Sequence, residues 1–176
     1  MSNKLFEAIY KGNINNIRKL VSEGYDLNNT FDSEDEGKTP LMAATEQDNL
    51  KVIKNLLQLG ADIFQTTEMR EDNIITWCSK WGTSKNFEFL AEYMGKCFNI
   101  NYANKEGNTS LMLAASYGFT DMLNTILKYE PSLHIKNEDQ EDVFDILNNS
   151  LINDREATKK ELAKLLTQQT ISKMKR

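Results

Sequence analysis

The sequence has few residues of three types: two cysteines, on which cross-links depend, one histidine, the most frequent acid–base catalyst, and two prolines, which interrupt helices. Cys78 and Cys97 are too few for a disulfide framework, which favours a reducing cytoplasm. No apolar run approaches the roughly 20 residues that a bilayer-spanning helix needs. Glu7 and Lys11 interrupt the N-terminal stretch where a signal peptide has its apolar core. We therefore expect a cytoplasmic protein that does not enter a membrane.

The same scarcity argues against a chemical site. His134 lies in PSLHIKN with no nucleophile beside it, and Cys78 occupies a small-residue position that suits a buried thiol. Cys78, Cys97 and His134 do not have the short spacing of a zinc site. The run DSEDEG at 32–37 lacks the alternating ligands of a calcium loop. We expect no catalytic residue, no cofactor and no metal; loss of a turnover activity on mutating His134 and Cys78 would favour the enzyme alternative.

Charge is unevenly distributed along the chain, whose net charge is −5. Residues 1–72 carry 8 basic and 13 acidic side chains, and residues 73–154 carry 6 and 11. Residues 155–176 carry 7 basic and 2 acidic side chains, so an acidic body is followed by a basic tail. An acidic body repels phosphate backbones and favours basic partners.

What the sequence does contain is an internal repeat. If Leu41 is taken as an origin, an alanine follows at +3, a turn residue at +7, an apolar pair at +15 and +16 and a glycine at +19. Much of this pattern returns from four other origins, with substitutions in the later copies and only its first part in the last. The five origins, spaced 33 to 36 residues apart, are Leu5, Leu41, Ile75, Leu111 and Phe144. Self-similarity at this period is typical of a stacked repeat array.

Each repeat predicts two short helices. Thr39 supplies a capping oxygen and Pro40 takes the first helical position, where its missing N–H costs nothing. Small residues at +3 let a neighbouring helix approach closely. We expect Gly12, Gly82 and Gly118 to end the first helix in a left-handed conformation. Because such a pair cannot bury its apolar faces alone, the repeats must stack.

The chain resembles the ankyrin-repeat family, and the resemblance covers nearly its whole length. It is carried by the segments GKTPLMAAT at 37–45, LLQLGAD at 56–62, EGNTSLMLAASYGF at 106–119 and LFEAIYKGN with KLVSEGYDLN between 5 and 28. The resemblance implies one all-α solenoid of helix–turn–helix repeats over 1–36, 37–70, 71–103, 104–136 and, in part, 137–154. Repeat three matches least well. An amphipathic helix over 155–176 is expected to seal the array.

By this resemblance, partners bind along the turn tips and the exposed end of each first helix, at offsets +5 and +6. Three repeats hold an aromatic there, either as an anchor for a partner or as cover for the next repeat. The first turn tip is also about three residues longer than its equivalent and is acidic. The candidate partner-binding residues are Tyr10, Lys11, Asp32, Glu34, Asp35, Glu36, Glu46, Gln47, Lys80, Trp81 and Tyr117.

The favoured function is a non-catalytic protein binder. The chain is similar to small, acidic bacterial ankyrin proteins that act as immunity proteins or antitoxins. Such a protein would be a monomer alone and a heterodimer with a basic toxin, which it would occlude. The Asn-, Lys- and Ile-rich composition fits a bacterial source. An effector or adaptor that binds a host or cellular protein is the alternative. Nucleic-acid or lipid binding through the basic tail is less favoured, because the tail lacks bulky aromatics.

Overall fold

The structure, a computed structural model, describes residues 3–30 and 37–149, with positions 160, 163–164, 167–168 and 170–171 of the tail. Across these residues the regular elements are helices, and the one β-interaction is an isolated bridge between Ala103 and Thr109. The prediction of an all-α fold built from helix pairs is confirmed. The acidic segment 32–36 lies outside the described residues, as does most of the predicted helix over 155–176.

The chain divides into two compact units, residues 1–98 and 99–176, and each is described here by itself. The first unit contains α1 (Asn3–Tyr10), α2 (Ile14–Ser22), α3 (Pro40–Thr45), α4 (Leu50–Gln58), α5 (Ile74–Trp81), α6 (Ser84–Met94) and the 3-10 turn η1 (Gly95–Cys97). The second unit contains α7 (Ser110–Tyr117), α8 (Thr120–Leu127) and α9 (Val143–Asn149). Each origin of the sequence repeat therefore lies in a first helix: α1, α3, α5, α7 or α9.

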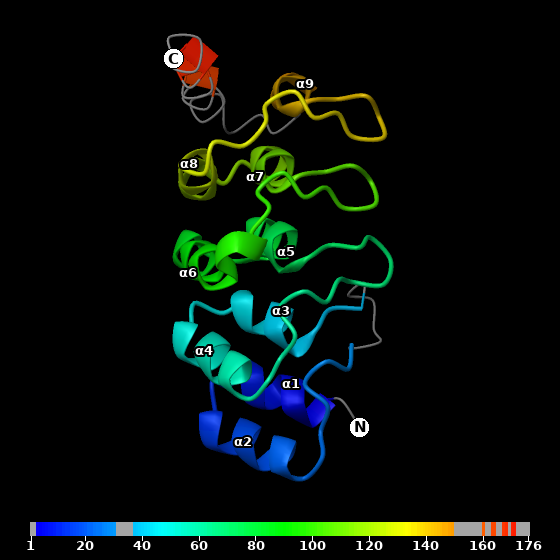
Figure 1. Ribbon diagram of the computed structural model, residues 1–176, viewed down its shortest axis with the longest axis vertical. Helices are drawn as coiled ribbons and strands as arrows, with labels where there is room; N and C mark the ends of the chain where they lie inside the picture. The colour runs from blue at the N-terminus through cyan, green and yellow to red at the C-terminus, as the bar shows by residue number, and fades with distance from the viewer. Residues whose placement is uncertain are drawn as a thin grey trace. The chain divides into compact units, whose positions relative to one another are not determined.

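In the first unit, consecutive first helices pack on one another, α1 on α3 and α3 on α5, and each also packs on its own second helix. Figure 1 shows α1, α3 and α5 along one side of this unit and α2, α4 and α6 along the other. The small residues at +3, which are Ala8, Ala44 and Cys78, are fully buried. Small side chains at this contact allow the close helix approach that the sequence predicts.

The predicted left-handed glycine at the end of the first helix is present in two of the three repeats for which the sequence predicts it. Thr39 accepts a hydrogen bond from the Met42 N–H, and Pro40 is the first residue of α3. Gly12 and Gly118 have φ of +65° and +67°, in the left-handed region. The prediction for Gly82 is wrong: its φ is −94° and its ψ −170°, which is extended backbone. Glycine suits this position because a Cβ would collide with Cys78 Sγ and would lie 2.9 Å from the Cys78 carbonyl oxygen.

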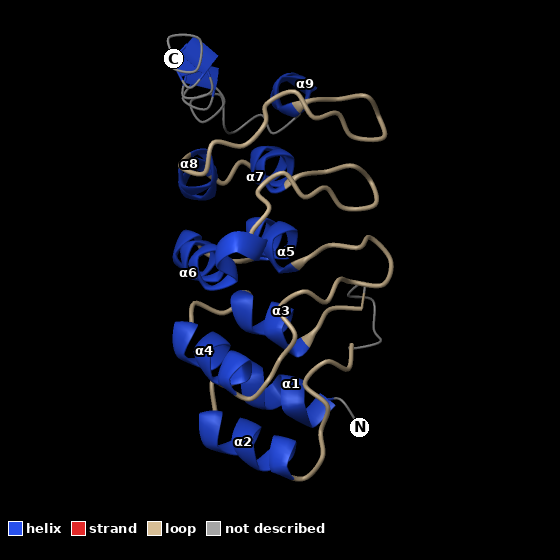
Figure 2. Ribbon diagram, in the orientation of Figure 1, coloured by secondary structure: helices blue, strands red, loops and turns tan. Residues whose placement is uncertain are grey.

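The second unit places α7 against both α8 and α9. The hairpins that precede α7 and α9 extend beyond these helices as uncoiled loops in Figure 2. They are joined by hydrogen bonds, since Glu138 N–H donates to the Glu106 carbonyl at 2.9 Å and Asn137 Nδ2 donates to Asn108 Oδ1 at 3.1 Å. Gly107, with φ of +77°, lets the two hairpins approach, because a Cβ there would lie 2.7 Å from Asn137 Cα. These hydrogen bonds and the close approach at Gly107 fix the position of one hairpin relative to the other.

Candidate protein-binding surface

Each first helix ends where the sequence places the candidate contact residues. In the first unit, Tyr10 ends α1, Glu46 follows α3 directly and Trp81 ends α5. In the second unit, Tyr117 ends α7. Tyr10 and Trp81 are exposed and Tyr117 is half-buried. The helix ends therefore present aromatic side chains to solvent, although their neighbours differ from repeat to repeat.

Tyr10 and Glu46 come together across the first two repeats. The Tyr10 hydroxyl donates to Glu46 Oε2 at 3.1 Å, and Lys38 Nζ donates to Glu46 Oε1 at 3.2 Å. Lys38 Nζ also lies 5.6 Å from the centre of the Tyr10 ring, within cation–π distance. Burial raises the pKa of Tyr10, so its hydroxyl stays protonated and donates at neutral pH. The three side chains therefore form one connected polar cluster.

Lys80 does not lie on the surface that the sequence predicts for it. Its side chain is 1% exposed, and Nζ lies 2.9 Å from Asp72 Oδ2, whose side chain is 0% exposed. The ammonium also lies 5.4 Å from the centre of the Trp77 ring. Lys80 turns inward because a fully buried carboxylate needs a compensating cation. We therefore remove Lys80 from the candidate surface.

Trp81, the next residue, is 50% exposed. Its ring centre lies 6.5 Å from that of buried Trp77, with the ring planes tilted by 49°. The buried indole braces the exposed one, so Trp81 offers apolar area without a large loss of side-chain freedom on binding. In the second unit, Tyr117 stacks on Phe119 with ring centres 5.7 Å apart and an angle of 16° between the planes.

The remaining candidate residues differ in how much of each side chain is exposed to a binding partner. Lys11 is exposed and forms an ion pair with Glu7 at 3.7 Å, one helical turn earlier. Gln47 is half-buried, and its backbone carbonyl accepts a hydrogen bond from Asn86 Nδ2 at 3.2 Å. The candidates of the long acidic turn, which are Asp32, Glu34, Asp35 and Glu36, lie outside the described residues.

Sequence reasoning missed a polar feature that recurs at fixed positions. In repeats two and three, the residues three before and five after the origin form an ion pair, and we call this arrangement the −3/+5 slot. Repeat two fills it with Lys38 and Glu46, and repeat three with Asp72 and Lys80, in the opposite charge order. The available signal was a pair of opposite charges eight residues apart at the same register in both repeats.

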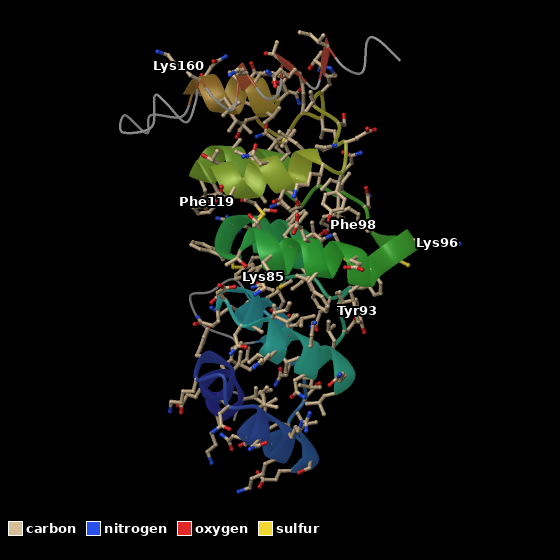
Figure 3. The ribbon with its side chains drawn as sticks, turned by 90° about the vertical axis from the view of Figure 1, so that its left-hand side faces the viewer. Lys85, Tyr93, Lys96, Phe98, Phe119 and Lys160 are labelled. Atoms are coloured by element: carbon tan, nitrogen blue, oxygen red, sulfur yellow. The ribbon has the colours of Figure 1, made fainter. Side chains whose placement is uncertain are left out.

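Sequence reasoning also missed exposed apolar side chains away from the first-helix ends. Tyr93 is 53% exposed on α6, and its ring centre lies 6.0 Å from that of Phe89. Lys54 Nζ of α4 lies 5.1 Å from the centre of the Phe89 ring. Figure 3 shows Tyr93 toward the end of α6, on the other side of its ribbon from Phe98, which follows the helix. Phe64 and Met69, in the segment between α4 and α5, are exposed as well. Their positions carry no repeat signature that would have predicted exposure.

The two cysteines and the histidine differ in burial. Burial raises the pKa of the Cys78 thiol to about 12, so it is not a thiolate at neutral pH, whereas Cys97 is exposed. His134 is exposed in the loop after α8. Among the described residues, no three His, Cys, Asp or Glu side chains gather as a metal site would require. The helices of residues 3–30 and 37–149 include none that is long and apolar enough to cross a bilayer.

Comparison with known families agrees with the repeated helix pairs. A family model described as "Ankyrin repeats (3 copies)" matches residues 2–67, and one described as "Ankyrin repeat" matches residues 106–138. The first match contains α1 to α4 and the second contains α7 and α8. Neither match includes residues 68–105, the repeat with the least regular sequence. The chain belongs to the ankyrin-repeat family, whose repeats are protein–protein interaction modules.

Proposed function

We propose that this chain is a non-catalytic, cytoplasmic immunity protein of bacterial origin that binds and occludes a basic toxin. The observation that carries the proposal is the indole of Trp81, which is 50% exposed at the end of a first helix while its neighbour Trp77 is buried. Tryptophan is one of the residue types enriched among binding hot spots. Tyr10, at the equivalent end of α1, adds a second aromatic contact.

Charge supports a basic partner. Residues 1–154 carry 14 basic and 24 acidic side chains, so the repeats have a strong acidic excess. Four of these acidic residues, Asp32, Glu34, Asp35 and Glu36, follow one another closely in the sequence between the first two repeats. Such an excess accelerates encounter with a basic protein and disfavours acidic competitors.

The proposed mechanism is occlusion. The aromatic side chains at the helix ends bind next to the toxin's active site or substrate groove, and the repeat surface covers it. Tight binding of this kind needs one or two well-buried anchors surrounded by contacts that exclude water. The chain itself transforms nothing, and it is a monomer until it forms a heterodimer with its partner.

The test is capture from cells of the native source with a tagged chain, followed by mass spectrometry and measurement of affinity for the captured protein. Trp81→Ala should weaken binding by at least about 30-fold, which corresponds to about 2 kcal/mol. The matched control is Tyr93→Ala, which removes an equally exposed aromatic from the second helix of the same repeat. It should change the affinity less than twofold.

The captured protein then decides the biological role. A basic protein whose toxicity is abolished by the chain and restored by Trp81→Ala would support immunity. A captured host or cellular protein without toxic activity would refute immunity and favour an effector or adaptor. Equal losses for Trp81→Ala and Tyr93→Ala would refute the assignment of binding to the first-helix ends.

A further inference from the structure

The −3/+5 slot differs between the two units of the chain. In the first unit, the carboxylate of each slot faces an ammonium of the same slot: Glu46 faces Lys38 at 3.2 Å, and Asp72 faces Lys80 at 2.9 Å. In repeat five, position −3 is Glu141, but position +5 is the neutral Asn149, whose Nδ2 donates to Glu141 Oε1 at 2.7 Å. The slot geometry is kept there while its cation is missing.

Repeat four has no charge in its slot, which holds Asn108 and Ser116. Neither of these short side chains fills the space that a lysine or glutamate takes in the first unit. A pocket of about 290 Å³ lies here, between the slots of repeats four and five. Its polar lining consists of Asn108, Ser116, Asn137, Asp139, Glu141 and Asn149. The pocket therefore combines two carboxylates with amide and hydroxyl groups.

We propose that this pocket receives a lysine or arginine side chain of the protein partner, which supplies the cation that the slots of the first unit contain internally. The inference rests on the proposed function, because it assumes a protein partner. It adds the chemistry of one contact: a basic side chain whose head group lies against Glu141 and Asp139.

The shape of the pocket suits such an occupant. A volume of 290 Å³ lies at the lower limit of pockets that hold small molecules, so one long side chain fills much of it. Met112, Leu113 and Ile146 form an apolar wall. The methylene stem of a lysine or arginine packs on such a wall while its charged end reaches polar groups. A purely apolar side chain would cover the two carboxylates without offering either of them a hydrogen-bond donor.

The other charged groups of the two hairpins strengthen the preference for a cation. Glu106 Oε2 accepts from Asn108 Nδ2 at 3.2 Å and adds a third carboxylate next to the lining. Lys136, on the same hairpin as Asp139, donates from Nζ to the Gln140 carbonyl at 3.0 Å and is not part of the lining. Two hydrogen-bonded hairpins hold these groups in place, so the pocket exists before binding.

The test uses short peptides as probes, so it needs no identified partner. A capped pentapeptide with a central lysine in a Gly/Ser context is titrated into the ¹⁵N-labelled full chain, and amide shifts are followed by NMR. The matched peptide has norleucine, which keeps the methylene stem and lacks the charge. The lysine peptide should give saturable amide shifts around Ser116, Glu141 and Asn149. Its affinity, obtained from these shifts, should be at least fivefold weaker for Glu141→Gln. Asp121→Asn, which neutralises an exposed carboxylate on α8, should leave the shifts unchanged.

Equal shifts with lysine and norleucine peptides would overturn the inference, as would equal effects of Glu141→Gln and Asp121→Asn. A chain that responds only after the seven basic residues of 155–176 are replaced by glutamine would show that its own tail fills the pocket, which also overturns it. Failure here alongside a Trp81→Ala variant that still loses the captured partner would leave the proposed function standing. Success here alongside a captured protein that has no toxic activity would refute the proposed immunity function and leave the chemistry of this contact standing.

Discussion

Replacing Lys80 with methionine should destabilise the chain by about 3–5 kcal/mol, the usual cost of removing one partner from a buried ion pair. Asp72 is 0% exposed, and its Oδ2 lies 2.9 Å from the Lys80 ammonium. Methionine keeps most of the side-chain volume, so packing against Trp77 changes little. The expected cost therefore arises from a carboxylate that loses its cation in a region that water does not reach.

The equivalent ion pair in repeat two, Lys38 with Glu46, serves as the comparison for Lys80→Met. Lys38 lies 3.2 Å from Glu46, whose side chain keeps 19% of its exposure. Water can therefore solvate the Glu46 carboxylate after the lysine is removed. Lys38→Met should cost only about 1–2 kcal/mol, between the values typical of exposed and of buried pairs. The difference between the two variants compares a fully buried carboxylate with a partly exposed one at the same register, where Glu46 also keeps the hydrogen bond from the Tyr10 hydroxyl.

The assay is urea unfolding followed by circular dichroism at 222 nm and by tryptophan fluorescence, with stability obtained by linear extrapolation. The double variant Asp72→Asn with Lys80→Met removes both charges and should recover at least half of the loss, since an apolar or neutral replacement of a buried pair is often tolerated. A cost below about 1 kcal/mol for Lys80→Met, or one equal to that of Lys38→Met, would refute the reasoning. So would a double variant less stable than Lys80→Met alone.

Three further predictions follow from other residues. Burial raises the pKa of Cys78 from an ordinary value of 9.0 to about 12 in the folded chain, so the stability that its neutral thiol contributes is complete below pH 9 and is lost between pH 9 and 12. At pH 10.5 the free energy of unfolding should be lower by about 2 kcal/mol, and Cys78→Ala should abolish this loss. An equal loss in Cys78→Ala would contradict the prediction. Gly82→Ala should lower the free energy of unfolding by more than about 1 kcal/mol in thermal unfolding, because the new Cβ would collide with Cys78 Sγ. Adding Cys78→Ala removes the sulfur and should restore part of the loss. No rescue would mean that the contact with the Cys78 carbonyl dominates. Neutralising Asp32, Glu34, Asp35 and Glu36 should slow association with the captured partner several-fold at low salt and leave dissociation nearly unchanged, as measured by stopped flow; an unchanged association rate would exclude steering.

The repeats themselves could be predicted from the sequence because they depend on short-range rules. Thr39 and Pro40 begin a helix by local capping, and the buried alanines and Cys78 at +3 follow from the period of about 34 residues. These signals involve neighbours in sequence or in register. They are therefore readable without knowing how any particular side chain is oriented.

The fate of the surface residues could not be predicted in the same way. Offset +5 holds an exposed Tyr10 in one repeat and a buried Lys80 in another. What decides between them is the residue eight positions earlier, since Asp72 draws the Lys80 ammonium inward. Gly82 shows the same limit, because its requirement comes from the sulfur of Cys78 and not from a left-handed turn. Such pairwise contacts need side-chain geometry, which a repeat pattern does not contain.

The opposite charge orders of the −3/+5 slot have a consequence for engineering this array. A consensus repeat, designed by choosing the residue at each position separately, treats positions −3 and +5 as independent. The charge at either position is compensated only by the opposite charge at the other. A hybrid repeat that took Lys38 from one copy and Lys80 from the next would enclose two ammonium groups at ion-pair distance. Recombination of this protein should therefore exchange whole repeats, since the two charges of a slot compensate each other only when they stay together.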